Sequence, residues 1–121
     1  MTLQQIQFLH RSYPLIFSQQ IGVDCPNGWF DLIDRVCAQL EQFAKAQQAC
    51  GVSIGSLPQL RDIKEKHGLL CIYFSGDDPR IDTLLLEAEE ESKRLCAICG
   101  KQATTRRGFN RLCEVHGAAR L

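Results

Sequence analysis

A repeated pair spacing near the end of the chain constrains its fold more than any other feature. Cys96 and Cys99 are separated by two residues, and Cys113 and His116 repeat this gap after the thirteen residues 100–112. Each pair can turn its side chains onto one ion, and the intervening loop is long enough to bring the pairs together. Three thiolates and one imidazole are a tetrahedral ligand set that suits Zn²⁺. The sequence therefore predicts a Cys3His zinc site.

Four protein ligands fill a tetrahedral zinc ion and leave no position for water or substrate, so the spacing predicts a structural metal. Cys-His catalysis is a weaker interpretation, because Cys71 lies only four residues from His67 and no acidic residue stands where it would orient the histidine. Phosphate-binding loops and dinucleotide fingerprints are absent from the sequence. We therefore expect neither enzymatic activity nor a small-molecule substrate.

The four cysteines outside the zinc motif indicate the cellular compartment in which the protein resides. The sequence has seven cysteines, and the four outside the zinc motif follow no disulfide-scaffold spacing. We expect them to be reduced in a cytoplasmic protein; the alternative is two disulfides in a secreted chain. Residues 1–20 lack the pattern of a secretory signal, and the longest apolar run, 69–74, is far shorter than the ~20 residues of a membrane span. The four residues are Cys25, Cys37, Cys50 and Cys71.

Charge is balanced overall but unevenly distributed. Residues 1–92 carry seven Lys/Arg against thirteen Asp/Glu, a net charge of −6, whereas residues 93–121 carry seven Lys/Arg against one Glu, a net charge of +6. Such asymmetry is informative about partners rather than about fold. We expect an acidic body over residues 1–95 and a basic zinc-binding unit over residues 96–121.

Apolar periodicity predicts three helices. They cover residues 2–12, about 28–48, and a third segment that opens with Asp78 as N-cap and Pro79 in the first turn. Asn27 is the candidate cap of the second helix. No glycine or proline separates the third helix from Cys96, so we expect the zinc unit to be joined to it rigidly.

Two strands are expected at 60–64 and 69–74, joined by a turn at 65–68. The second strand is apolar on both faces and is predicted to be central, whereas the first is amphipathic and predicted to lie at an edge. A third strand from 15–22 or 51–57 is an open possibility. The expected fold class is α+β, a small helix and β-hairpin body with a C-terminal zinc-ribbon unit.

Several segments together resemble a known group of proteins. They are Gly28–Asp34, Ile63–Tyr73, Glu87–Ser92, Cys96–Gly100 and Arg111–His116. This combination resembles small, mostly uncharacterised bacterial and phage-associated proteins with a Gly-Trp helix, a Lys-Glu-Lys hairpin and a C-terminal Cys-pair zinc ribbon. The resemblance implies a setting of mobile elements, toxin–immunity loci or phage–host conflict, and it carries no established activity. The chain departs from the group's pattern at His67 and after Gly100.

The functional expectation is a protein-interaction module acting as an inhibitor, immunity or anti-defence protein, such as an anti-CRISPR or toxin antagonist. An acidic body suits a protein partner such as a nuclease or a nucleic-acid-binding complex. The alternative is a small nucleic-acid-binding regulator that uses the basic zinc end, where cationic side chains and an aromatic ring can contact phosphates and bases. The candidate contact residues are Lys101, Arg106, Arg107, Phe109 and Arg111.

Overall fold

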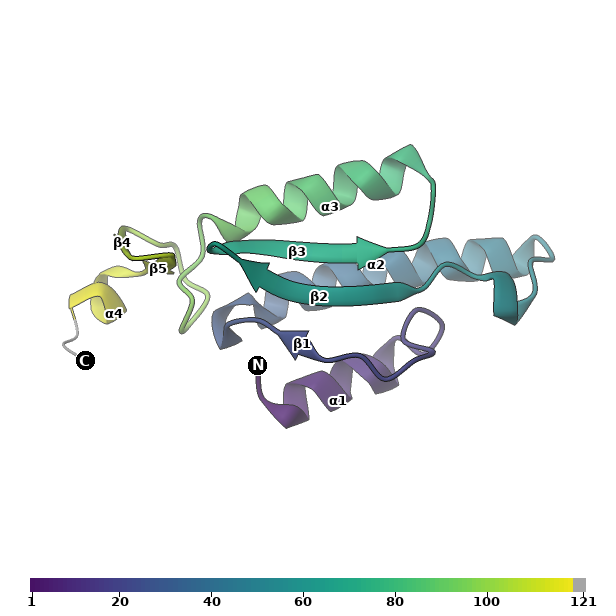
Figure 1. Ribbon diagram of the computed structural model, residues 1–121, viewed down its shortest axis with the longest axis horizontal. Helices are drawn as coiled ribbons and strands as arrows, with labels where there is room; N and C mark the ends of the chain where they lie inside the picture. The colour runs from purple at the N-terminus through teal and green to yellow at the C-terminus, as the bar shows by residue number, and fades with distance from the viewer. Residues whose placement is uncertain (119–121) are drawn as a thin grey trace.

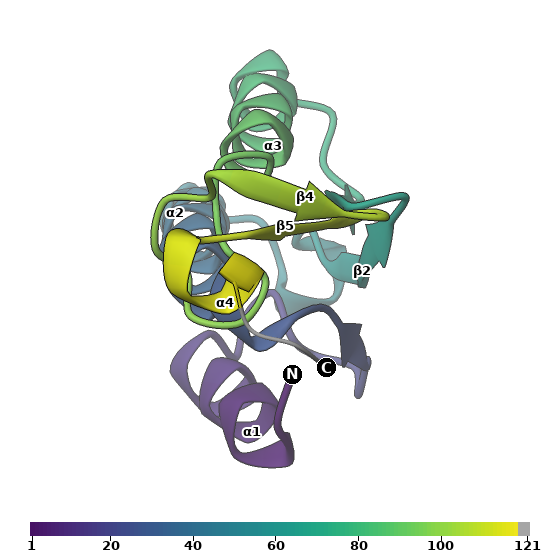
Figure 2. The same ribbon diagram turned by 90° about the vertical axis from the view of Figure 1, so that its left-hand side faces the viewer.

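The computed structural model describes residues 1–118 and confirms the predicted α+β fold. A three-stranded sheet has α2 along one face, with α1 and α3 on either side of that helix (Figures 1 and 2). A separate two-stranded hairpin and a short helix, α4, form the C-terminal end of the molecule (Figure 1). The four ligand candidates lie in this end unit, next to the end of α3.

The helices begin where local chemistry predicts. Helix α1 spans Leu3–Ser12, and Thr2 forms a capping box with Gln5 at its start. Helix α3 spans Pro79–Ser92, and the Asp78 carboxylate accepts a hydrogen bond from the Arg80 amide. The remaining helices are α2, Phe30–Ala49, and α4, Glu114–Ala118.

The second helix begins differently from the prediction. Asn27–Trp29 form a 3-10 turn and Asn27 makes no cap, so the predicted N-cap is wrong. The Trp29 amide bonds to the Pro26 carbonyl, and the Gly28 amide bonds to a residue far along the chain, Ala97. The start of this helix therefore carries one local bond and one bond to a distant segment.

The sheet order reverses the predicted roles of the two long strands. Strand β2, Leu60–Lys66, is central: it pairs with β3, Leu69–Phe74, on one side and with β1, Val23–Asp24, on the other. Strand β3 is the edge in the part of the chain that the structure describes. The prediction fails because β1 is too short to show a periodic pattern. The turn between the long strands is tighter than expected, since β2 continues to Lys66.

The two segments considered for a third strand form other structure. Residues 54–56 are a 3-10 turn, and 15–22 run as a loop held by the carboxylate of Glu41. Glu41 is only 3% exposed and accepts hydrogen bonds from the amides of Leu15 and Ile16. Those amides are satisfied by a side chain, which removes the need for a strand partner.

One hydrophobic core unites the helices and the sheet. Trp29, in the turn that precedes α2, is buried, and Ile63 from the central strand is fully buried in the same core. Each fully buried large aliphatic side chain contributes roughly 1.5–3 kcal/mol. Within residues 1–118, no helix is both long and apolar enough to cross a membrane.

Candidate metal centre

Two tight turns present the four candidate ligands. In the first, the Ile98 amide donates to the Cys96 Sγ at 3.4 Å, and in the second the His116 amide donates to the Cys113 Sγ at 3.5 Å. The second turn opens helix α4, whose residue Gly117 donates its amide to the Cys113 carbonyl. Such N–H···S contacts curl each pair so that both side chains point to the same side. Each pair of ligand candidates in the sequence therefore forms one tight turn in the structure.

The hairpin between the turns closes the site. Strands β4, Thr105–Arg107, and β5, Asn110–Leu112, pair in antiparallel register. The amide of Ala97 donates to the carbonyl of Arg111, which ties the first turn to β5 just before the second pair of ligands. The thirteen residues between the pairs therefore fold as a hairpin that holds the two turns next to each other.

The four side chains converge on one point. One ligand atom from each of Cys96, Cys99, Cys113 and His116 lies within 4.8 Å of the others, and this cluster can hold a metal ion. The Cys99 and Cys113 sulfurs are 3.7 Å apart, and His116 Nδ1 lies 3.5 Å and 3.3 Å from the sulfurs of Cys96 and Cys113. Tetrahedral Zn–S bonds of about 2.3 Å give edges of about 3.8 Å, so the donor set and its spacing fit Zn²⁺. His116 presents Nδ1, not Nε2, to the cluster.

The backbone favours a thiolate at the buried ligand. Burial of Cys96 opposes ionisation, but hydrogen bonds from the amides of Cys113, Cys99 and Ile98 outweigh it and lower the pKa of Cys96 to about 6. A thiolate is the form that binds a metal. The backbone therefore stabilises the metal-binding form of this one ligand.

The first turn also contacts the body. The Gly28 amide donates to the Ala97 carbonyl at 2.9 Å. A Cβ on Gly28 would overlap the Cys96 carbonyl oxygen and would lie 2.8 Å from the Gly100 nitrogen. Only glycine permits this approach of the metal unit's backbone to the body. The sequence pattern indicated for Gly28 only a position at the start of a helix.

The tip of the β2–β3 hairpin makes a second contact with the metal unit. His67 and Gly68 both have positive φ there, and a Cβ on Gly68 would overlap the carbonyl oxygen of Phe109. The rings of His67 and Phe109 lie 5.3 Å apart, and Arg111 Nη1 donates to the Gly68 carbonyl at 3.1 Å. The end of the hairpin therefore packs directly on the hairpin that carries the ligands.

The five residues predicted to touch a partner make different contacts within the chain. Phe109 and Arg111 take part in intramolecular docking, although Phe109 keeps half of its surface exposed. Arg107 bonds to the Gly117 carbonyl, and Arg106 bonds to the Gly108 carbonyl across the turn. Lys101 is exposed. Arg106 and Arg111 are opposite each other in the β4–β5 ladder, so the hairpin brings these two candidates together.

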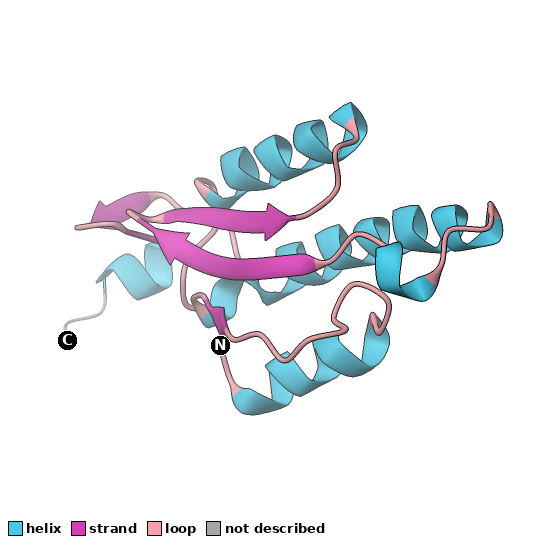
Figure 3. Cartoon of the chain, turned by 45° about the vertical axis from the view of Figure 1, so that its right-hand side comes forward, coloured by secondary structure: helices cyan, strands magenta, loops and turns pink. Residues whose placement is uncertain are grey.

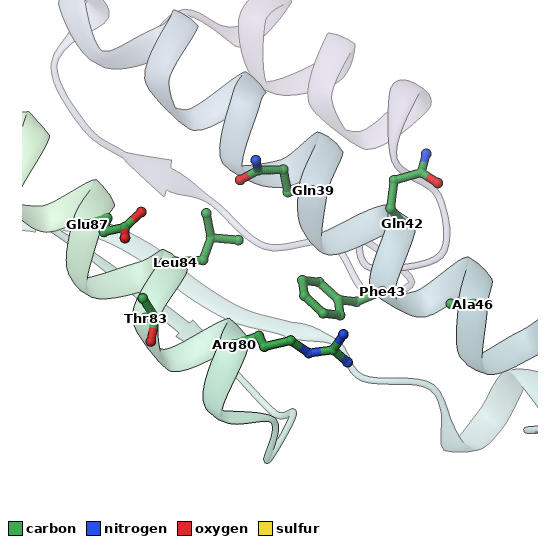
Figure 4. A pocket seen from close by; sticks show the side chains of 8 residues that line it. All are labelled: Gln39, Gln42, Phe43, Ala46, Arg80, Thr83, Leu84 and Glu87. Atoms are coloured by element: carbon green, nitrogen blue, oxygen red, sulfur yellow. The ribbon is translucent and has the colours of Figure 1, made fainter.

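A shallow groove of about 490 Å³ lies between α2 and α3, away from the metal unit. Figure 4 shows Phe43 and Leu84 pointing toward each other across it, with Arg80 beside the Phe43 ring. The Arg80 guanidinium lies 5.0 Å from the ring centroid and is also paired with Asp78. Among the residues that line the groove, Arg80 and Glu87 carry charge, and Arg80 is already paired with Asp78.

Comparison with known proteins gives no family, because no family model, curated protein or solved structure matches the chain. The resemblance to phage-associated zinc-ribbon proteins stays a prediction.

Proposed function

We propose that the protein is a non-enzymatic interaction module whose basic end is folded by one structural Zn²⁺ and whose acidic body binds another protein. The observation that carries this is the closed cluster of three sulfurs and one imidazole nitrogen at the joint between the two parts. When Zn²⁺ is bound, it supplies a rigid tetrahedral cross-link. Inhibition of a nuclease or another nucleic-acid-binding partner is the form of interaction that the charge favours.

The metal unit has little else to hold it together. Its buried apolar cluster consists of Leu112 with Cys96 and Cys113, whereas Ile98 and Val115 are largely exposed. Three buried residues cannot offset the conformational entropy of ordering more than twenty, at about 1–2 kcal/mol each for the backbone. A metal cross-link supplies the missing stability, as it does in other small metal-folded units.

Charge supports a protein partner over nucleic acid. The body carries −6 over residues 1–92, a surface complementary to the basic face of a nucleic-acid-binding protein. The alternative, a nucleic-acid-binding regulator, would need a continuous basic surface on the metal unit, yet Phe109 and Arg111 are engaged by the body. We therefore favour the interaction module.

The metal is tested first. Elemental analysis of the purified full chain should find one zinc per chain, and Cys99→Ser should lose it. Cys50→Ser is the matched control, since Cys50 is exposed and far from the ligand cluster in sequence. Retention of full zinc by Cys99→Ser, or absence of zinc from the wild type, would contradict the proposal.

The partner class is tested with the same preparation. Anisotropy with random-sequence DNA and RNA between about 50 and 200 mM salt should show no steep salt-dependent binding. Affinity purification from the source cell should recover a protein that binds the purified chain directly, with its activity reduced on binding. Tight nucleic-acid binding with a steep salt slope, and no direct protein partner, would favour the alternative.

A further inference from the structure

Strand β3 is an open edge with an apolar face. Its six residues, Leu69–Phe74, include no charged side chain. Tyr73 is 43% exposed, and Leu86 on the neighbouring α3 is 63% exposed. Edges of this kind normally carry charges, proline or a bulge that discourage pairing. The described part of the chain supplies no further strand beyond β3 (Figure 3).

The hydrogen-bonding direction of this edge follows from one contact. The Leu70 amide donates to Ser92 Oγ on α3, at 3.1 Å, and so points away from β2. In an antiparallel ladder, residues two apart point the same way, so the N–H and C=O of Ile72 also lie on the open side. Ser92 satisfies the first of these amides, whereas the outward-facing amide of Ile72 has no hydrogen-bond partner within residues 1–118.

A groove of about 390 Å³ runs beside this edge, between β3 and α3. Its wall on the helix side is formed by Asp82, Leu85, Leu86 and Glu89, so that apolar residues lie between two acids. Seven residues of α-helix separate the two acids by about 10 Å. Alternate residues of an extended strand, three along one face, cover a similar length of about 13 Å.

We propose that the open edge of β3 accepts an extended strand from a partner protein, and that the strand's face toward α3 carries one apolar residue flanked two positions away on each side by lysine or arginine. Main-chain hydrogen bonds to Ile72 provide the pairing, and Asp82 and Glu89 select the flanking cations. This inference rests on the proposed interaction function and adds the chemistry of the partner.

A second copy of the chain fits this edge less well. Two β3 strands paired across a twofold axis would bring the Asp82 and Glu89 carboxylates of both copies to the same rim. Like charges placed together oppose association, whereas a basic strand neutralises both acids. Charge therefore selects a partner strand over self-pairing.

The test uses a labelled peptide, Thr-Lys-Val-Leu-Val-Lys-Thr, with capped ends, and its twin in which both lysines are glutamates. Anisotropy should show that the wild-type chain binds the basic peptide at least about tenfold more tightly than the acidic one. The double variant Asp82→Lys/Glu89→Lys should invert this preference. The control Glu87→Lys/Glu90→Lys makes the same change in charge on α3 outside the β3 groove and should keep the wild-type preference.

Amide hydrogen exchange by NMR identifies the binding mode. The Ile72 amide should exchange fast in the free protein and slowly with the basic peptide bound, while the Cys71 amide, which belongs to the β2 ladder, stays slow throughout. Peptide binding without slowing at Ile72, equal binding by the two double variants, or slowing that depends on protein concentration alone would each overturn the inference. A native protein partner that binds Asp82→Lys/Glu89→Lys as tightly as wild type would overturn it while leaving the interaction function intact.

Discussion

The amide of Gly28 donates a hydrogen bond to the carbonyl oxygen of Ala97, 2.9 Å away, and this bond joins the two parts of the molecule. Gly28 lies in the turn that precedes α2, and Ala97 lies between two ligands of the metal site. The next residue, Trp29, is the single tryptophan of the chain and is buried. Folding of the metal unit and the start of the longest helix are thereby linked.

Gly28→Ala should destabilise the protein strongly. The added methyl group would overlap the Cys96 carbonyl oxygen, and backbone atoms cannot move aside as a flexible side chain would. We expect a loss of about 3 kcal/mol in the free energy of unfolding, the upper part of the range for overpacking, measured by urea denaturation. Gly55→Ala is the control, since a Cβ there meets nothing within 4 Å, and it should change stability by less than about 0.5 kcal/mol. Equal stability of the two variants would show that the close approach is not required.

Thiol labelling should separate six of the seven cysteines into three classes, with Cys71, of intermediate burial, left aside. In the zinc-loaded protein, N-ethylmaleimide should modify the exposed Cys50 first, whereas Cys25 and Cys37 stay unmodified because both are buried. Burial raises the pKa of Cys25 to about 12, so its reactive thiolate is scarce at neutral pH. A chelator should expose the three cysteines of the metal site, and only urea should expose the buried pair. Mass spectrometry of peptides checks the order; labelling of Cys96 at the same rate before and after chelation would contradict it.

Glu41→Gln should destabilise the loop that follows α1. The carboxylate of Glu41 accepts hydrogen bonds from the amides of Leu15 and Ile16, at 3.2 Å and 3.1 Å. An amide side chain retains one accepting oxygen, so one of these N–H groups loses its partner. We expect a loss of about 1–3 kcal/mol in urea denaturation. The exposed Glu87→Gln should be near neutral, and a similar small effect at both positions would argue against the role of Glu41.

Stability should decline in alkaline solution partly through Tyr13. Burial, and then the hydrogen bond donated to Asp34, raise the pKa of the Tyr13 phenol above its ordinary value. A raised pKa in the folded state gives stability that is complete below the unfolded pKa of about 10 and is lost as the pH rises above it. The stability difference between wild type and Tyr13→Phe should therefore shrink between about pH 8 and pH 11. A constant difference, measured by urea denaturation at both ends, would exclude this contribution.

The sequence alone determined the features that depend on neighbouring residues. Thr2 and Asp78 cap their helices through contacts within one turn, and the apolar stripe of α2 needs only the helical period. The spacing of the four ligand candidates likewise suffices to place them together, because each pair is bent by its own backbone.

Tertiary structure decided what depends on residues distant in sequence. The pairing of Val23 with Ile63 makes β2 central and leaves β3 open, and a two-residue strand has too little pattern to be predicted. The roles of Gly28 and Gly68 also depend on distant residues. Each must be glycine because the backbone of another segment lies against it, and the sequence does not show which segments meet. The sequence predicts Phe109 as a partner contact because it is an aromatic residue among cations, yet its ring lies beside His67 because the two hairpins meet.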